Sequence, residues 1–373
     1  MIIKNGNVFC PDGFFHKKDL YIANKRIVSD SISALEDQIV IDAEGNYVIP
    51  GLVDIHSHGA NGHDFCDASA DGLKEILKYE KKCGITSYCP TSMTYSFDIL
   101  KGIFETVKEV EESVDGTSQE YARIAGINME GPFISPEKKG AQNEKYIENP
   151  DIEMFKKLNN LSGNRIKLVT LAPELDNSLD FIKELKDEVN ISVGHTSATY
   201  DEAMAAFKSG ANHITHLCNA MPPFHHRDPG VFGAAADSKY VFTELICDGI
   251  HIHPSMIRSI FKLFGSNRVT LISDSMEATG MQDGEYELGG QKVIKRGNHA
   301  TLTDGTLAGS ATNLFDCMKK AVTFGVPLEH AITAATANPA KSIGAYPEIG
   351  CLDIGSRADA LIISKDLELL RVI

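Results

Sequence analysis

The chain has 373 residues, of which 43% are apolar and 23% are charged, and this composition is typical of a soluble globular protein. Its formal charge of −15 disfavours nucleic acids and anionic membranes as partners, because both select for clustered Lys and Arg. No apolar run approaches the roughly 20 residues that span a bilayer, and residues 1–7 lack the features of a signal peptide. We therefore expect a cytoplasmic protein.

The eight cysteines are scattered and form no C-x-x-C pair, so they indicate neither a zinc ribbon nor a disulfide framework. The thirteen histidines are unevenly distributed, and seven of them fall within residues 195–253, where a uniform distribution would put about two. Clustered imidazoles in a cytoplasmic chain indicate metal binding or acid–base chemistry.

Residues 1–50 alternate short apolar runs with turn residues, for example Ile2–Lys4 and Asn7–Cys10 around a turn at Asn5-Gly6, which predicts a small β module. From residue 51 to about 340 the pattern changes to strand, loop and helix in repetition. Eight apolar, β-rich runs are joined mostly by amphipathic stretches; the runs are Leu52–Ile55, Thr86–Cys89, Ile124–Met129, Leu168–Leu171, Ile191–Val193, Asn212–Thr215, Phe242–Cys247 and Val269–Ile272.

This order of elements predicts an α/β fold with a (β/α)₈ TIM-type barrel. A doubly wound open sheet is the alternative, but the segment Asp54–Gly59 after the first strand is not a Gly-rich phosphate loop. The run Ala358–Ser364 has the pattern of another strand, which we expect to return to the N-terminal module. We therefore predict a small β-sandwich domain of residues 1–50 and 345–373, and a barrel domain of residues 51–344.

In such a barrel the carboxyl ends of the strands converge on one mouth, where catalytic residues lie. Side chains typical of metal sites follow five of the predicted strands: His56, His58, Glu130, His195, His216 and Asp274. Two His with one carboxylate and an open position is the pattern of a catalytic divalent-metal site. Such a metal lowers the pKa of bound water from about 15.7 toward 7, and a carboxylate such as Asp274 can pass the released proton to a leaving group.

These blocks, in this order, resemble the amidohydrolase superfamily and, more narrowly, its N-acetylglucosamine-6-phosphate deacetylases. The resemblance is carried by the His-x-His strand, Glu130-Gly131-Pro132, Val193–Thr196 and, most specifically, Thr215–Gly230. It implies metal-dependent hydrolysis of the acetamide of N-acetylglucosamine 6-phosphate, giving glucosamine 6-phosphate and acetate. It also implies that metal-bound hydroxide attacks the carbonyl while Asp274 acts first as general base and then as general acid.

The resemblance further implies a role for each matching residue. Glu130, His195 and His216 would hold the main metal, Zn²⁺ or Fe²⁺, and the pair His56 and His58 makes a second ion possible. Arg227 and His251 match phosphate-contacting positions, and the Arg resembles one donated across a dimer interface, so we expect a homodimer with Arg227 reaching the neighbouring site. Other positions that match substrate-contacting residues are Ala141, Asn219, Ala220, Leu307, Ala308 and Gly309.

Position 142 departs from the family pattern. Gln142 stands where the family usually has a His that contacts the substrate near the reacting carbonyl. Because Gln can donate a hydrogen bond but is not protonated near neutral pH, we expect weaker polarisation of the substrate or a different acyl preference. Two other histidines receive no role: His213 begins a strand run and is expected to face a helix, and His253 is not assigned.

Three alternatives stay open at this point. A deacetylase of the galactosamine epimer differs by one inverted hydroxyl, whose contacts the sequence does not locate. Another amidohydrolase, of the dihydroorotase or hydantoinase kind, is disfavoured because those enzymes commonly place a carboxylated Lys at the end of strand four, and here Leu171 is followed by Ala-Pro-Glu. A non-catalytic sugar-phosphate-binding protein would have no need of Asp274.

Overall fold

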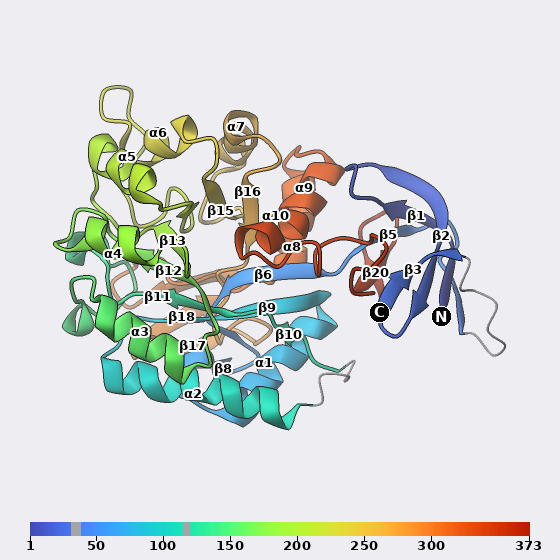
Figure 1. The fold of residues 1–373 in the computed structure, drawn as a ribbon, viewed down its shortest axis with the longest axis horizontal. Coiled ribbons are helices and arrows are strands. Elements are labelled where there is room, and N and C mark those ends of the chain that lie inside the picture. The colour runs from blue at the N-terminus through green and yellow to red at the C-terminus, as the bar shows by residue number, and fades with distance from the viewer. Residues whose placement is uncertain (31–38, 115–119) are drawn as a thin grey trace.

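A parallel barrel and a sheet built from both chain termini lie side by side in the computed structural model, which describes residues 1–30, 39–114 and 120–373 (Figure 1). Neighbouring barrel strands pair in parallel, as a (β/α)₈ barrel requires. The barrel strands are β6 (Leu52–Ser57), β9 (Ile85–Ser92), β11 (Ile127–Glu130), β12 (Ile166–Leu171), β13 (Asn190–Val193), β14 (His213–Ile214), β15 (Phe242–Ile246) and β16 (Val269–Ile272), and a short β10 (Arg123–Ile124) also pairs with β9. The predicted barrel is confirmed.

Backbone hydrogen bonds join the last barrel strand to the first at the carboxyl ends. The Asp274 N–H donates to the His56 carbonyl over 2.9 Å, and the His58 N–H donates to the Ser275 carbonyl over 2.8 Å. His56, His58 and Asp274, which form this junction, are therefore also predicted metal ligands or catalytic residues. Closure of the barrel and placement of the site depend on the same short segments.

Alternate residues of the barrel strands belong to two different apolar clusters. Leu168 packs with Val53 and Ile55 in one cluster, whereas Val169 and Leu171 pack in the larger cluster that contains the apolar residues of the helices. Side chains of a strand point alternately to its two faces, so a strand covered on both faces needs apolar residues at almost every position.

Helices follow most of the barrel strands and cover the outside of the barrel (Figure 1). In α7, Pro254 occupies the first turn, the His253 Nδ1 accepts a hydrogen bond from the Ser255 N–H, and Ile257, Ile260, Phe261 and Phe264 form the buried stripe. His253 therefore has a structural role as a helix cap. The helices are α1 (Ala70–Lys82), α2 (Phe97–Ser113), α3 (Ile152–Leu161), α4 (Ser178–Leu185), α5 (Tyr200–Ser209), α6 (Gly230–Asp237), α7 (Pro254–Phe264), α8 (Leu314–Thr323), α9 (Leu328–Ala335) and α10 (Ala337–Ser342). Within the described ranges, none of them is long and apolar enough to cross a bilayer.

The terminal sheet has seven strands from both ends of the chain, β1 (Ile2–Phe9), β2 (Phe15–Ala23), β3 (Arg26–Val28), β4 (Val40–Asp42), β5 (Tyr47–Pro50), β20 (Ala360–Ile363) and β21 (Leu369–Val372). Its own apolar cluster joins residues such as Ile3 and Val8 to Ala360 and Ile362, as the predicted small sandwich requires. The predicted domain boundaries at 50/51 and 344/345 stay a prediction.

The turn predicted at Asn5-Gly6 is wrong, because β1 runs through it. The register with β2 shifts between Ile3 and Gly6, and Asn5 adopts a positive φ of 58° there. Its side-chain amide donates to the Asp42 carboxylate, which holds the bulge against β4. Asn tolerates the left-handed conformation, and here that property serves a bulge within a strand.

A three-stranded antiparallel sheet that the sequence pattern did not predict lies between β16 and α8. It consists of β17 (Gly284–Leu288), β18 (Gln291–Arg296) and β19 (His299–Leu302). Leu288, Val293 and Ala300 pack in a cluster with Met93 and Ala141. The sheet thereby places Leu288 and the loop of residues 306–309 beside the barrel mouth. A two-stranded ladder, β7 (Gly59–Ala60) with β8 (His63–Asp64), follows β6.

We predict that Gly194→Ala destabilises the barrel by about 1–3 kcal/mol in urea unfolding. An added Cβ would lie 2.5 Å from the Thr215 Cβ and 3.1 Å from the Thr170 Cγ2. Thr215 cannot move away easily, because its hydroxyl is hydrogen-bonded to the hydroxyls of Thr170 and Ser192. The control is Gly102→Ala in α2, where an added Cβ would meet nothing within 4 Å and helix propensity favours Ala. Equal stability of the two variants would contradict the prediction.

Candidate metal and substrate site

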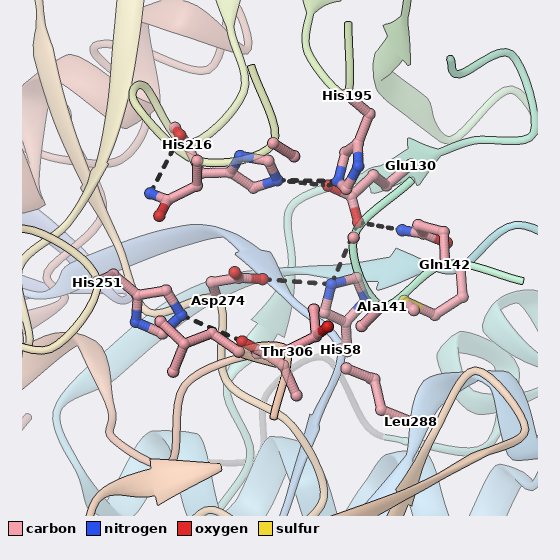
Figure 2. A pocket seen from close by; sticks show the side chains of 17 residues that line it. His58, Glu130, Ala141, Gln142, His195, His216, His251, Asp274, Leu288 and Thr306 are labelled. Atoms are coloured by element: carbon pink, nitrogen blue, oxygen red, sulfur yellow. Dashed lines mark hydrogen bonds and ion pairs between the residues drawn. The ribbon is translucent and has the colours of Figure 1, made fainter. Parts of the chain in front are cut away.

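Six buried polar side chains converge at the carboxyl ends of the barrel strands, and Figure 2 shows all of them except His56. Each lies at or just beyond a strand end: His56 and His58 at β6, Glu130 at β11, His195 beyond β13, His216 beyond β14 and Asp274 beyond β16. Their exposed fractions are 8% or less. The structure thus brings together all of the metal-ligand and general-base candidates that the sequence indicates.

Glu130, His195 and His216 form the first metal group. The Glu130 Oε1 lies 3.2 Å from the His195 Nε2 and 3.0 Å from the His216 Nε2, and these two nitrogens are 3.1 Å apart. The three ligand atoms all lie within 4.8 Å of one another, so a single ion can contact all of them. Two imidazoles and one carboxylate are a typical donor set for Zn²⁺ or Fe²⁺.

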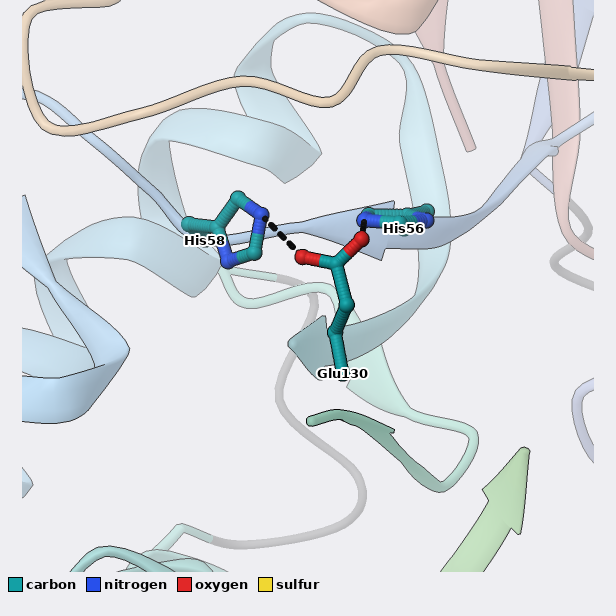
Figure 3. Close-up of side chains that lie close together, drawn as sticks. All are labelled: His56, His58 and Glu130. Atoms are coloured by element: carbon teal, nitrogen blue, oxygen red, sulfur yellow. Dashed lines mark ion pairs between the residues drawn. The ribbon is translucent and has the colours of Figure 1, made fainter. Parts of the chain in front are cut away.

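His56, His58 and Glu130 form the second metal group (Figure 3). The His56 Nε2 is 3.4 Å from the Glu130 Oε1, and the His58 Nε2 is 3.4 Å from the Glu130 Oε2. The same carboxylate therefore belongs to both groups and could bridge two ions. Asp274 borders this group, with its Oδ1 3.3 Å from the His58 Nε2 and 3.5 Å from the His56 Nε2.

The outer ring nitrogens orient these imidazoles as ligands. The His195 Nδ1 faces the Lys138 carbonyl at 2.8 Å, and the His58 Nδ1 faces the Thr91 carbonyl at 3.1 Å. Because a carbonyl oxygen only accepts, Nδ1 must carry the hydrogen, and the lone pair of a neutral ring then lies on Nε2, toward Glu130. This arrangement fits a divalent ion among the facing Nε2 atoms.

Burial and neighbouring charges shift the pKa values of His58 and Glu130 in opposite directions. Burial alone would lower the pKa of His58, but hydrogen bonds with Asp274 and Glu130 raise it to about 10. Burial would raise the pKa of Glu130, but the surrounding imidazoles hold it well below its ordinary value. Since ligands must lose their protons to bind an ion, metal binding to this site releases protons.

Three of the converging residues have strained backbones. His195, His216 and Asp274 adopt positive φ angles of 46°, 26° and 50°. A non-glycine residue in this region costs on the order of 1–3 kcal/mol and persists only where the surrounding structure imposes it. The strain turns each side chain from its strand end toward the shared centre.

Gln142 is fixed in one orientation beside Glu130. Its Oε1 accepts a hydrogen bond from the Thr94 N–H over 2.7 Å, so its amide nitrogen faces the Glu130 Oε2, also at 2.7 Å. Both partners of the side chain are thus protein groups, and Gln142 holds the carboxylate that the two metal groups share. It also lines the cavity described next.

A cavity of about 240 Å³ opens over the converging side chains. Eight of the nine predicted substrate-contacting residues line it: Ala141, Gln142, Asn219, Ala220, His251, Leu307, Ala308 and Gly309. Met93 and Leu288, which sequence reasoning did not identify, add apolar surface next to Ala141. In Figure 2, His251 lies on the opposite side of the cavity from Gln142 and Ala141.

Arg227 does not line this cavity in its own chain. It is exposed, on the loop between β14 and α6, and its guanidinium contacts the His226 Nε2 at 2.8 Å. Within its own chain Arg227 therefore does not reach the cavity, and its phosphate contact stays a prediction.

The hydrogen-bond partners of His251 favour its doubly protonated form. Its Nδ1 lies 2.7 Å from an Asp248 carboxylate oxygen, and its Nε2 lies 3.1 Å from the Ala308 carbonyl. Both partners only accept, so both ring nitrogens must carry hydrogens. Burial lowers the pKa of His251, but the Asp248 hydrogen bond and charge outweigh it and raise this pKa above its ordinary value.

Two residues of the site, Glu244 and Asp248, escaped sequence reasoning. Glu244 lies within the apolar run of β15, where a single acid carries no local signal, and its Oε1 is 3.1 Å from the His213 Nε2. The expectation that His213 faces a helix is therefore wrong, because its ring turns toward the barrel interior. Asp248 follows the same strand, three residues before His251, and that spacing could have indicated the pair.

Comparison with known proteins agrees with this geometry. Residues 47–373 match the amidohydrolase family. The chain belongs to the amidohydrolase family. It is 39% identical to an N-acetylglucosamine-6-phosphate deacetylase of Bacillus subtilis (strain 168), over 100% of this chain and 92% of that protein. An N-acetylgalactosamine-6-phosphate deacetylase of Escherichia coli O157:H7 is 31% identical over 93% of this chain and 92% of its own length.

A solved structure of this type has the same fold. A mutant N-acetyl-D-glucosamine-6-phosphate deacetylase from Mycobacterium smegmatis, in complex with N-acetyl-D-glucosamine-6-phosphate, is 30% identical, with a TM-score of 0.90 over 100% of this chain and 97% of that chain. In this amidohydrolase, then, the cavity, the His and Glu groups and the neighbouring Asp occur together in one chain.

We predict that Zn²⁺ added to chelator-stripped protein raises the midpoint of thermal unfolding, because the ion binds only the folded arrangement of ligands. At one hundred times the dissociation constant, a ligand adds about 2.7 kcal/mol to the free energy of unfolding. Glu130→Gln should abolish most of the rise, since Glu130 belongs to both metal groups. Glu188→Gln, at an exposed position after α4, is the control and should keep the full rise. An equal rise in both variants would place the ion elsewhere.

Proposed function

We propose that this protein is a metal-dependent deacetylase that hydrolyses N-acetylglucosamine 6-phosphate to glucosamine 6-phosphate and acetate. The observation that carries the proposal is the convergence of Glu130, His195, His216 and Asp274 beneath one cavity, in a chain that matches N-acetylglucosamine-6-phosphate deacetylases over its whole length. Non-catalytic binding of a sugar phosphate would not require an acid beside two metal groups.

Glu130, His195 and His216 would hold the main ion, and His56 and His58 would hold a second ion that shares Glu130. Zn²⁺ and Fe²⁺ are the ions that best suit this mixture of imidazole and carboxylate. When bound, the metal acidifies a water molecule and polarises the amide carbonyl.

Asp274 is the general base and then the general acid. Burial would raise its pKa, but the hydrogen bond with His58 and the charges of the neighbouring imidazoles lower it, so the carboxylate starts ionised. It lines the cavity and can accept the proton of the attacking water. When the tetrahedral intermediate collapses, the same carboxyl donates this proton to the departing nitrogen.

The two sides of the cavity suit the two ends of the substrate. The His251 imidazolium, with Asn219 and Ala220, provides a polar side for the sugar 6-phosphate. Met93, Ala141 and Leu288 provide an apolar side for the acetyl methyl group. The reacting carbonyl then lies between them, beside the metal groups. Gln142 is committed to Glu130 and Thr94, so it acts on the carbonyl through Glu130.

Two further features belong to this proposal. We infer a homodimer in which Arg227 of each subunit reaches the phosphate bound in the cavity of the other subunit. Arg227 is exposed and does not line the cavity of its own subunit. A planar, permanently charged guanidinium binds a phosphate dianion through paired hydrogen bonds. We also expect the enzyme to act in the cytoplasm, on a phosphorylated sugar that does not cross membranes freely.

We predict that the Zn²⁺- or Fe²⁺-loaded enzyme releases acetate from N-acetylglucosamine 6-phosphate with a higher kcat/KM than from the galacto epimer. Asp274→Asn should lower kcat by about 10²–10⁴-fold, because the amide cannot take the proton from water. Its metal content and substrate affinity should be retained, whereas the exposed Asp201→Asn should match the wild type in every respect. A preference for the galacto epimer would support the second candidate substrate, that of the Escherichia coli relative. No release from either epimer would refute the deacetylase.

We predict that mixing two inactive variants, Arg227→Ala and Asp274→Asn, restores activity. In a hybrid dimer, one cavity has an intact Asp274 from its own subunit and an intact Arg227 from the other. Hybrids isolated through two different affinity tags should therefore reach about half of the wild-type rate per dimer. Hybrids as inactive as their parents would show that Arg227 does not act across an interface.

A further inference from the structure

Glu244 is a buried carboxylate in the barrel interior that contacts one residue of each metal group, His56 and His216. It is 0% exposed, and its two oxygens meet three hydrogen-bonding groups. Its Oε2 lies 2.9 Å from the His56 Nδ1 and accepts a hydrogen bond from the His216 backbone N–H over 3.1 Å. Its Oε1 lies 3.1 Å from the His213 Nε2. Burying a carboxylate costs desolvation free energy, which hydrogen bonds to its partners must offset. In the low dielectric of the interior these hydrogen bonds are strong, so they hold each partner firmly.

The first consequence concerns which nitrogen of His56 carries the hydrogen. The Oε2 of an ionised Glu244 only accepts, so the His56 Nδ1 must donate to it. The lone pair of the neutral ring then lies on Nε2, which has no hydrogen-bond partner within the described parts of the chain and sits 3.4 Å from the Glu130 Oε1. Glu244 thereby turns the ligand atom of His56 toward the second metal group.

The second consequence concerns the backbone of His216. This residue adopts a φ of 26°, far from the ordinary range, and its N–H is held by the same Glu244 oxygen that holds His56. Without that acceptor, the backbone could relax and swing the His216 Nε2 away from the Glu130 Oε1, which is now 3.0 Å distant. One carboxylate oxygen thus supports one ligand of each group.

We propose that Glu244 is a positioning residue that couples the two metal groups, by fixing the ring of His56 and the backbone of His216 through a single oxygen. The proposal rests on the metal-binding part of the function proposed above. Loss of Glu244 should weaken both ions together, although Glu244 touches neither the substrate cavity nor the ligand atoms of the first group.

The test is the affinity for Zn²⁺ and the metal content per folded chain of Glu244→Gln. Loss of an outer carboxylate typically weakens metal binding by about 10–100-fold, and we expect this for both ions. The matched control is Glu80→Gln in α1, an equally buried acid whose carboxylate has no hydrogen-bond partner among the described residues. It should bind metal like the wild type. His213→Gln removes only the Oε1 partner and should change the affinity less than Glu244→Gln does.

Wild-type affinity of Glu244→Gln for both ions would overturn the proposal, and loss of only one ion would overturn the coupling. If Glu244→Gln does not fold, ¹⁵N NMR of the Zn²⁺-loaded wild-type protein decides: His56 should carry its hydrogen on Nδ1, and a hydrogen on Nε2 would refute the orientation argued here. These readouts require no substrate. A wild-type protein that binds Zn²⁺ but releases no acetate would therefore refute the deacetylase and leave the role of Glu244 standing.

Discussion

The carboxylate of Glu130 is the contact on which the arrangement of the whole site depends. It ends β11 in the barrel interior, and four imidazoles have their Nε2 atoms within 3.4 Å of one or other of its oxygens. A buried acid surrounded in this way is stable only if positive charge accompanies it, whether as protons on the rings or as metal ions between them. Because the buried carboxylate is unfavourable without positive charge beside it, the site favours the binding of cations. Gln142 adds an amide contact to this carboxylate, which fixes its rotation.

A second layer of acceptors keeps the imidazoles in place, and it consists mainly of groups that the barrel must place there in any case. The carbonyls of Thr91 and Lys138 belong to β9 and to the segment that follows β11. The orientation of His58 therefore depends on the register of β9, because a strand shifted by one residue would turn its carbonyl away. His56 is the exception, since its acceptor is the side chain of Glu244 and not a backbone carbonyl. The barrel closes through backbone bonds at His56, His58 and Asp274, so the site cannot loosen without loosening the fold.

The sequence predicted the parts of this molecule that follow from local pattern. Strand ends such as Val193 before Gly194-His195 are recognisable because an apolar run stops at glycine and a polar residue follows. Other parts depend on contacts between distant segments. Glu244 sits in a run of apolar neighbours, and its partners His56 and His213 lie 188 and 31 residues away. The positive φ angles of His195 and His216 also correspond to no local pattern in the sequence. Asn5 shows the converse, since a residue with a strong local preference for turns was used in a bulge.

The net charge of −15 disfavours long polyanions and yet is compatible with a phosphorylated substrate, because the two ligands experience different fields. A polyanion samples the whole surface, where acidic residues predominate. A small dianion in a cavity of about 240 Å³ responds to the groups within a few ångströms. There the Asp248–His251 pair matters through its asymmetry. The Asp248 carboxylate is turned away from the cavity and consumed by hydrogen bonds from His251 and Ile250, whereas the ring it charges lines the cavity. An acid buried behind a histidine thus makes the surface in front of it positive, and an acidic protein can offer an anion site without any excess of Lys or Arg.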